Sequence, residues 1–175
     1  MTQLAILTAP HPILKKRALA VTDVNDQVRQ LMQDMLETMY EGEGIGLAAN
    51  QVGALQRVMV LDLQNSPQDV ERPAGFYPLF IANPEIIEAS EELVEAEEGC
   101  LSLPDQSILV TRPYSVKLRY KDYNNKLQEL DAEGWLARAI QHEIDHLNGK
   151  LLIDSLSYAK KSAALRKLAK LKKTS

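Results

Sequence analysis

The 175-residue sequence contains a single cysteine, Cys100, so an internal disulfide is excluded. It also has no run of apolar residues near the ~20 that a membrane-spanning helix requires. The N-terminal stretch MTQLAILTAPHPIL lacks a basic start followed by a long apolar core, so we expect no secretory signal. These absences favour a reducing compartment, and we expect a cytoplasmic protein. The lone thiol becomes a candidate metal ligand or nucleophile.

What the sequence does contain is typical of one soluble globular domain. Hydrophobic residues make up 45% and charged residues 25% of the chain, whose length suffices for one compact core. The charge is unevenly distributed, because residues 160–175 carry seven basic and no acidic side chains. The rest of the chain therefore has a net charge of −11, against −4 overall. A basic tail on an acidic body suggests a separate role for the tail.

The first predicted helix follows Asn25, a candidate N-cap residue. From there to Met39, apolar side chains recur at helical spacing on one face. A glycine cluster, Gly42, Gly44 and Gly46, ends this pattern and therefore the helix.

Two further helices are predicted near the end of the chain. One is expected over about residues 132–147 and is ended by Asn148 and Gly149. The other is expected over about residues 158–172. Its apolar stripe consists of Ala164, Leu165, Leu168 and Leu171.

Extended segments fill the middle of the chain. Residues 64–78 are polar and include three prolines, so we expect a loop there. The expected strands cover residues 57–63, 79–82, 86–96, 107–111, 115–123 and 126–132. Strands in the middle of the chain, with helices at both ends and inside, predict an α+β fold in a single compact domain.

The segment AIQHEIDHLNG carries an HExxH motif on the second-last predicted helix. On a helix, His142 and His146 lie ~40° apart on one face, and Glu143 lies within the same arc. Two imidazoles at this spacing can share one metal ion, with the carboxylate beside an open coordination position. The alternative is a chance match on a solvated helix. The motif therefore predicts a metal site, with Glu143 beside it as the candidate acid–base.

A third protein ligand has to come from elsewhere in the chain. Metal-peptidase helices of one class continue to a third histidine, but Leu152 occupies that position, and no glutamate follows Glu143. His11, the only other histidine, lies between two prolines and resembles a surface turn residue. Cys100 remains, and a thiolate suits zinc or ferrous iron. The alternative for a lone cysteine is a buried core residue.

A site of one thiolate and two neutral histidines leaves a position for water, whose pKa the metal lowers. Glu143 is then the natural general base for that water. The pattern therefore predicts an open, catalytic site rather than a closed, structural one.

Three segments together resemble the peptide deformylase family. They are GIGLAANQVG at residues 44–53, EGCLSLP at 98–104 and QHEIDHLNG at 141–149, and the resemblance extends over about residues 6–156. It implies an α+β domain of mostly antiparallel strands around the HExxH helix. It also implies hydrolysis of the N-formyl group of N-formylmethionyl nascent polypeptides, with release of formate. Fe²⁺ is the implied metal in the cell, and zinc, nickel or cobalt could also occupy the site.

Position by position, the resemblance implies roles for individual residues. Cys100, His142 and His146 match the metal ligands, and Glu143 matches the catalytic acid–base. The side-chain amide of Gln51 and the backbone N–H of Leu101 match the donors to the developing oxyanion. An alternative for Gln51 is a polar residue that caps a loop.

The resemblance also implies how the substrate is bound. Ile45 and Gly46 match a segment that pairs with the substrate backbone as an added strand. Ile45, Trp135 and Ala139 are candidate walls of the formyl-methionine pocket, although core packing would explain them equally well. Arg138 could reach the pocket mouth or pair with the acidic Glu97–Glu98 segment. Where some family members have a basic residue after P-x-Q, this chain has Ser107, which leaves the binding of the distal peptide open.

The domain boundaries follow from these assignments. We expect a catalytic domain over residues 1–157 and a basic C-terminal helix or tail over 158–175. The tail resembles the extension through which bacterial deformylases contact the ribosome, and its charge favours RNA phosphate. The alternative is an ordinary amphipathic helix with lysines for solubility. The rival functions are a zinc endopeptidase and a non-enzymatic RNA-binding protein with a degenerate metal site; no membrane or DNA partner is expected.

Overall fold

The computed structural model describes residues 3–174, with side chains through Lys172. Within this range the predicted α+β fold is confirmed, with one compact domain of mostly antiparallel strands. The α-helices are α1 Asp26–Glu41, α2 Gly134–Leu147 and α3 Tyr158–Thr174. Short 3-10 helices are η1 Pro12–Lys15, η2 Ala49–Val52 and η3 Leu152–Ser155. The strands are β1 Gly46–Ala48, β2 Val58–Leu61, β3 Leu79–Ala89, β4 Leu93–Cys100, β5 Leu103–Pro113, β6 Ser115–Lys121 and β7 Leu127–Glu133.

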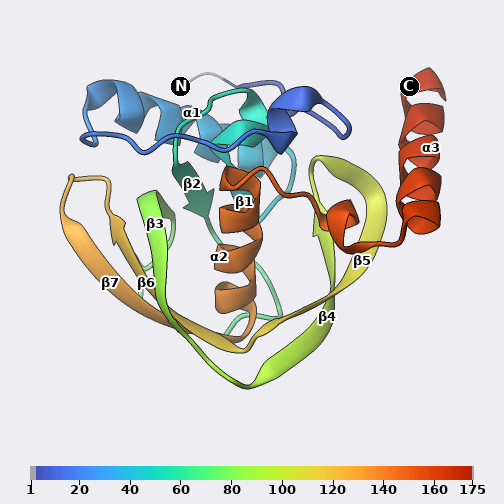
Figure 1. Cartoon of the computed structure of the whole chain (residues 1–175). Helices are drawn as coiled ribbons and strands as arrows, with labels where there is room; N and C mark the ends of the chain where they lie inside the picture. The colour runs from blue at the N-terminus through green and yellow to red at the C-terminus, as the bar shows by residue number, and fades with distance from the viewer. Residues whose placement is uncertain (1–2, 175) are drawn as a thin grey trace.

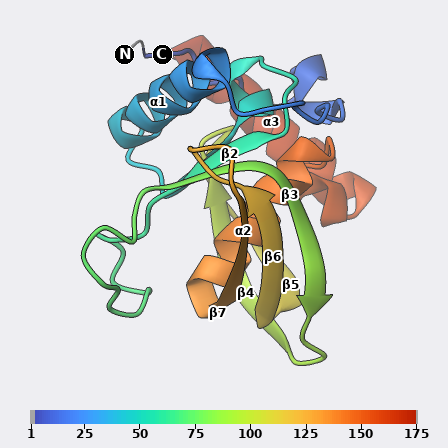
Figure 2. The ribbon, with the colours of Figure 1, turned by 90° about the vertical axis from the view of Figure 1, so that its left-hand side faces the viewer.

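The strands form two antiparallel sheets that flank one helix. The larger sheet has the order β1-β2-β3-β6-β7, and β4 pairs with β5 in a separate two-stranded ribbon. Figure 1 shows α2 standing between the two sheets. In Figure 2, where the molecule is turned by 90°, the segment between β2 and β3 extends away from the body of the fold. Side chains on α2 can therefore meet side chains from both sheets.

The apolar face of α2 fixes the helix against the larger sheet. Leu136 and Ile140 are fully buried, and they belong to one core cluster with Met59, Ile81 and Leu118 of strands β2, β3 and β6. Burying a leucine or isoleucine side chain contributes about 1.5–3 kcal/mol, so this face anchors the helix firmly. The opposite, polar face of α2 faces the ribbon β4–β5.

Helix α1 confirms the prediction made from its cap and periodicity. The side chain of Asn25 accepts a hydrogen bond from the backbone N–H of Val28 at 3.0 Å. The helix ends at Glu41, immediately before Gly42. Its methionines, Met32, Met35 and Met39, are completely buried in a second core cluster with residues of β1 and β2.

Several predicted boundaries were wrong. Helix α2 begins at Gly134 rather than at residue 132, because β7 continues to Glu133 by pairing with Ser115 of β6. The predicted strands at 79–82 and 86–96 are divided differently: β3 runs through an irregularity at Asn83, where φ is +50°, and the turn follows Ala89. Strand β1 was not predicted, since three residues are too few to show an alternating pattern.

Helix α3 lies at the side of the molecule, beside β5 (Figure 1). Of its predicted apolar stripe, Ala164 and Leu168 are buried in a third cluster with Ile108 and Leu152, and Leu165 and Leu171 are half-buried. The side-chain amide of Gln106 also donates to the carbonyl of Ala164 at 3.1 Å. Among residues 3–174, no helix is long and apolar enough to span a membrane.

Two glycines that flank α2 generate a stability prediction. Gly134 and Gly149 both have left-handed backbones, with φ of +63° and +76°. A Cβ on Gly149 would lie 2.5 Å from the carbonyl oxygen of Lys15, whereas one on Gly134 would meet no atom within 4 Å. We expect Gly134→Ala to cost only the backbone strain, about 1 kcal/mol, and Gly149→Ala to cost at least twice as much.

Urea unfolding of the two variants beside the unchanged protein measures this difference. Equal losses of unfolding free energy in both variants would contradict the predicted close approach between Gly149 and Lys15.

Candidate metal centre and active site

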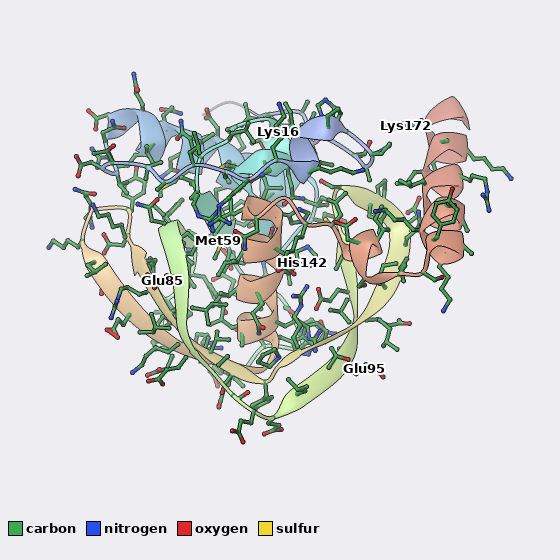
Figure 3. The ribbon with its side chains drawn as sticks, in the orientation of Figure 1. Lys16, Met59, Glu85, Glu95, His142 and Lys172 are labelled. Carbon is green, nitrogen blue, oxygen red and sulfur yellow. The ribbon has the colours of Figure 1, made fainter. Side chains whose placement is uncertain are left out.

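Three potential metal ligands meet between α2 and the ribbon β4–β5. Ligand atoms of Cys100, His142 and His146 all lie within 4.8 Å of one another, and residues 3–174 contain no other such group of cysteine, histidine and carboxylate side chains. The sulfur of Cys100 lies 3.2 Å from Nε2 of His146. Figure 3 labels His142 on α2, on the side of the helix toward β5. The structure thus brings together the three ligands predicted from sequence.

Local structure explains how two distant segments supply this group. His142 and His146 are one turn apart on α2, and their ring centroids are 5.0 Å apart. Cys100 ends β4 and pairs with Leu103 of β5 immediately after a register shift at Glu98. That irregularity re-aims the end of the strand, as bulges near functional sites commonly do. His11 lies elsewhere: its ring accepts from the N–H of Ile13 and caps η1.

A buried carboxylate, Glu98, connects the two segments. Its oxygens accept hydrogen bonds from Nε and a terminal nitrogen of Arg112, at 2.6 and 2.8 Å. They also accept from Arg138 at 2.5 Å and from Nδ1 of His142 at 2.9 Å. Burial opposes ionisation of Glu98, but the hydrogen bonds from Arg112 and His142 outweigh it and lower its pKa to about 2. An ionised Glu98 fixes the His142 ring with Nε2 facing the other ligands.

Arg138 hydrogen-bonds to the backbone of the ribbon β4–β5 as well as to the carboxylate of Glu98. Its guanidinium donates to the backbone carbonyls of Val94 on β4 and Val110 on β5, at 2.5 and 3.0 Å. The two roles weighed for Arg138 from sequence are therefore combined, because it pairs with Glu98 and also lines the cleft. Sequence reasoning missed Arg112, which bridges Glu98 and Asp145 of α2.

The two histidines have opposite pKa shifts. Burial works against a charged His142, but Glu143, the Cys100 sulfur and Glu98 outweigh it and place its pKa well above the ordinary value. Burial and the neighbouring His142 hold the pKa of His146 well below that value. A metal ion in this group would release the proton of His142, as expected for a ligand set that must be deprotonated.

The donor set fits a divalent transition metal. A thiolate with two imidazoles suits zinc or ferrous iron, and three protein ligands leave one position of a tetrahedron open. Cys100 is partly exposed while His142 and His146 are buried, so the open side faces the cleft rather than the core. The residues present therefore fit a catalytic metal centre.

Glu143 lies next to this group in a buried position. Its Oε2 is 4.0 Å from Nε2 of His142, and its other carboxylate oxygen is buried without a hydrogen-bond partner. Burial, reinforced by the nearby Glu98 carboxylate, raises the pKa of Glu143 to about 7. Gly46 makes room for it, because a Cβ there would lie 2.5 Å from Oε2. A carboxyl group with a pKa near neutrality can both accept and donate a proton.

Gln51 and Leu101 also lie beside the candidate metal ligands, and each belongs to a different segment of the chain. The amide nitrogen of Gln51 lies 3.5 Å from the Cys100 sulfur, and its amide oxygen accepts from the N–H of Ala48. Leu101 follows Cys100, and its side chain contacts the backbone at Gly44, where a Cβ would be 2.8 Å away. The segments that carry Gln51 and Cys100 therefore lie against each other.

One open cleft of about 660 Å³ is lined by five of these residues: Gln51, Cys100, Leu101, His142 and Glu143. The predicted substrate-binding residues Ile45, Gly46, Trp135 and Ala139 all line it, as does Ser107. Sequence reasoning missed Gln68, which also lines the cleft, since no periodicity distinguished it within the predicted loop at 64–78. The structure places the candidate residues together, and their individual roles stay predictions.

The molecule is thus an α+β protein in which an HExxH helix carries part of a candidate catalytic metal centre. A family model for polypeptide deformylases matches residues 3–162. The chain belongs to the peptide deformylase family, hydrolases that act on a formyl amide bond. This assignment contradicts both rival interpretations, the endopeptidase and the RNA-binding protein without enzymatic activity.

Individual relatives agree over nearly the whole chain. The peptide deformylase of Rickettsia typhi is 59% identical over 172 residues, which cover 98% of each sequence. The crystal structure of peptide deformylase from Ehrlichia chaffeensis matches with a TM-score of 0.91 at 38% identity, covering 99% of this chain and 98% of that one. A second Ehrlichia chaffeensis structure, in complex with actinonin, has a TM-score of 0.88 and 39% identity, covering 97% and 98%.

The contacts of Glu98 predict that it controls metal affinity. Glu98→Gln removes the charge that matches Arg112 and Arg138 and weakens the orientation of His142. We expect roughly 10- to 100-fold weaker binding of zinc, the usual loss when a partner of a ligating histidine is removed. Competition with a chromophoric chelator measures the affinity.

Glu95→Gln is the matched control, because this exposed glutamate lies on the same strand (Figure 3). Equal zinc affinity in the Glu98 and Glu95 variants would show that Glu98 does not orient the ligand.

Proposed function

We propose that this protein removes the N-formyl group from N-formylmethionyl nascent polypeptides and releases formate. The observation that carries the proposal is that the buried Glu143 lies 4.0 Å from His142, a member of the group Cys100, His142 and His146, and lines one cleft with Cys100 and His142. Relatives named peptide deformylase support the same reaction.

Cys100, His142 and His146 would hold one divalent metal ion, with Fe²⁺ as the ion in the cell and Zn²⁺, Ni²⁺ or Co²⁺ as substitutes. When bound, such an ion supplies a Lewis acid that polarises a carbonyl group and increases the acidity of water. Glu98 and Arg112 support this role by keeping His142 oriented.

Glu143 would move the protons of the reaction. It accepts a proton from the water molecule whose oxygen attacks the formyl carbon, and the resulting carbon is tetrahedral. The carbon–nitrogen bond then breaks, and Glu143 returns the proton to the leaving amine. Formate and a peptide with a free N-terminus result. The pKa of Glu143, about 7, suits both the acceptance and the return of the proton.

Gln51 and Leu101 would stabilise the negative oxygen that forms during attack. The amide nitrogen of Gln51 and the backbone N–H of Leu101 are the candidate donors, and they come from two segments that both line the cleft. Donors fixed in advance are effective because they need no reorganisation when charge develops.

The substrate would bind as an added strand along β1. This strand forms the edge of the larger sheet and pairs with β2 on one side, so an extended peptide can approach Ile45 and Gly46 from the other. Ile45, Trp135 and Ala139 would form the walls for the methionine side chain. Ser107 and Gln68 lie at the same cleft and are positioned to meet later residues of the peptide.

Replacing the proposed acid–base tests the reaction. Zinc-loaded or iron-loaded protein should release formate from formyl-Met-Ala-Ser and not cleave acetyl-Met-Ala-Ser. Glu143→Gln should keep the metal and reduce the turnover number by about 10²–10⁴-fold, the range of a lost general acid–base.

The control Glu129→Gln, an exposed residue of β7, should retain full turnover. Undiminished formate release by the Glu143 variant would remove this residue from the mechanism, and no formate release by the unchanged protein would refute the function.

We further propose that α3 contacts ribosomal RNA, which places the enzyme beside nascent chains in the cytoplasm. The helix packs on β5 through Ala164 and Leu168, and residues 160–172 carry six basic and no acidic side chains. This segment would thus form a functional unit separate from the catalytic domain at 1–157.

Charge removal tests the ribosome contact without disturbing the packed face. Replacing the exposed Lys160, Arg166 and Lys167 with glutamine should weaken ribosome binding in co-sedimentation and make the remaining binding less sensitive to salt, while formate release from a short peptide stays unchanged. The matched control replaces three basic residues on β6 and its turn, Lys117, Arg119 and Lys126. Equal ribosome binding by both triple variants would contradict the proposal.

A further inference from the structure

Ser102 is a buried polar residue that the proposed reaction does not use. It lies two residues after Cys100 in the segment between β4 and β5, and only 1% of its surface is exposed. Its hydroxyl oxygen accepts a hydrogen bond from the side-chain amide nitrogen of Gln51 at 3.0 Å. The side chain therefore faces the amide that the proposed function assigns to the oxyanion.

The amide group of Gln51 is held at both ends. Its oxygen accepts from the backbone N–H of Ala48 at 2.9 Å, and its nitrogen donates to the hydroxyl of Ser102. A flipped amide would turn its NH₂ group toward the N–H of Ala48, and two donors would then face each other. One orientation is thus selected, with the amide nitrogen on the side of Cys100.

The backbone around these two residues is connected by a third segment. The N–H of Leu7 donates to the carbonyl of Gln51 at 2.7 Å, and the N–H of Ala9 donates to the carbonyl of Ser102 at 2.9 Å. The N–H of Ser102 itself points to the sulfur of Cys100 at 3.4 Å. The distance between Gln51 and Ser102 is therefore fixed by backbone contacts on both sides.

An amide nitrogen carries two hydrogens, and Ser102 accepts one of them. The other points to the sulfur of Cys100, 3.5 Å from the amide nitrogen, at the cleft that both Gln51 and Cys100 line. We propose that Ser102 is a positioning residue: its hydroxyl holds the Gln51 amide so that the second hydrogen can pass from the sulfur to the substrate carbonyl oxygen. The proposal rests on the proposed deformylase reaction and assigns Ser102 a role that acts through Gln51.

A double-mutant cycle tests whether Ser102 acts through Gln51. Ser102→Ala should lower the turnover number roughly 10- to 100-fold with little change in KM, less than the ~10²–10³-fold loss from deleting an oxyanion donor. In a Gln51→Ala background, the same substitution should change turnover less than about twofold. Zinc content and the thermal midpoint of every variant are measured alongside.

The matched control is Ser155→Ala, which removes the hydroxyl of an exposed serine in η3 that donates to the carbonyl of Leu152. It should leave turnover unchanged in both backgrounds. A loss from Ser102→Ala that is equally large with and without Gln51 would overturn the proposal and indicate a structural role. Absence of any loss would overturn it as well.

A measurement on the unchanged protein covers the case in which Ser102→Ala does not fold. In zinc-loaded protein labelled with ¹⁵N, the side-chain amide signals of Gln51 are assigned by their loss in Gln51→Ala. One of the two amide hydrogens should exchange with solvent much more slowly than a free glutamine amide. Exchange of both at the free rate would contradict the hydrogen bond to Ser102. Formate release by the unchanged protein is scored separately, so failure of the reaction and failure of this role are distinguishable.

Discussion

The candidate metal centre depends on the ion-pair contacts of one buried carboxylate, Glu98. Cys100 belongs to the ribbon β4–β5 and the two histidines belong to α2, so their separation is set by how ribbon and helix are held together. Glu98 does this by accepting from Arg112 of β5 and from Arg138 and His142 of α2. A buried charge is tolerated only when it is paired and hydrogen-bonded, and removal of a partner from such a group costs about 3–5 kcal/mol. The position of the ribbon and the orientation of a ligand are therefore controlled by the same contacts.

A second consequence of this arrangement is a cleft whose two sides come from different sheets. Strand β1, an edge of the larger sheet, provides Gly46 opposite Glu143, and the end of β4 provides Cys100. A peptide that pairs with β1 as an added strand would lie beside both the candidate metal ligands and Glu143. Membership in the peptide deformylase family agrees with the proposed reaction, in which an extended peptide end, an activated water and Glu143 would meet in one place.

The sequence predicted those features that depend on residues close together in the chain. The pairing of His142 with His146, the Asn25 cap and the end of α2 before Asn148 and Gly149 follow from local helix geometry and capping alone. Cys100 was predicted as the third metal ligand because other candidates were eliminated and because its segment resembles the family motif. The partners of Glu98 and the contact of Ser102 with Gln51 could not be derived, because they depend on how the ribbon docks against α2 and on segments about 50 residues apart. The start of α2 was misplaced for a similar reason, since pairing with β6 keeps residues 132 and 133 in a strand.

X-ray absorption spectroscopy of the zinc-loaded protein can determine whether Cys100 completes a metal site with the two histidines of α2. We expect one sulfur scatterer at about 2.3 Å and two imidazole nitrogens at about 2.0–2.1 Å from zinc. In Cys100→Ser the sulfur shell should disappear while the imidazole contribution remains. A spectrum of the unchanged protein with nitrogen and oxygen scatterers only would exclude Cys100 as a ligand.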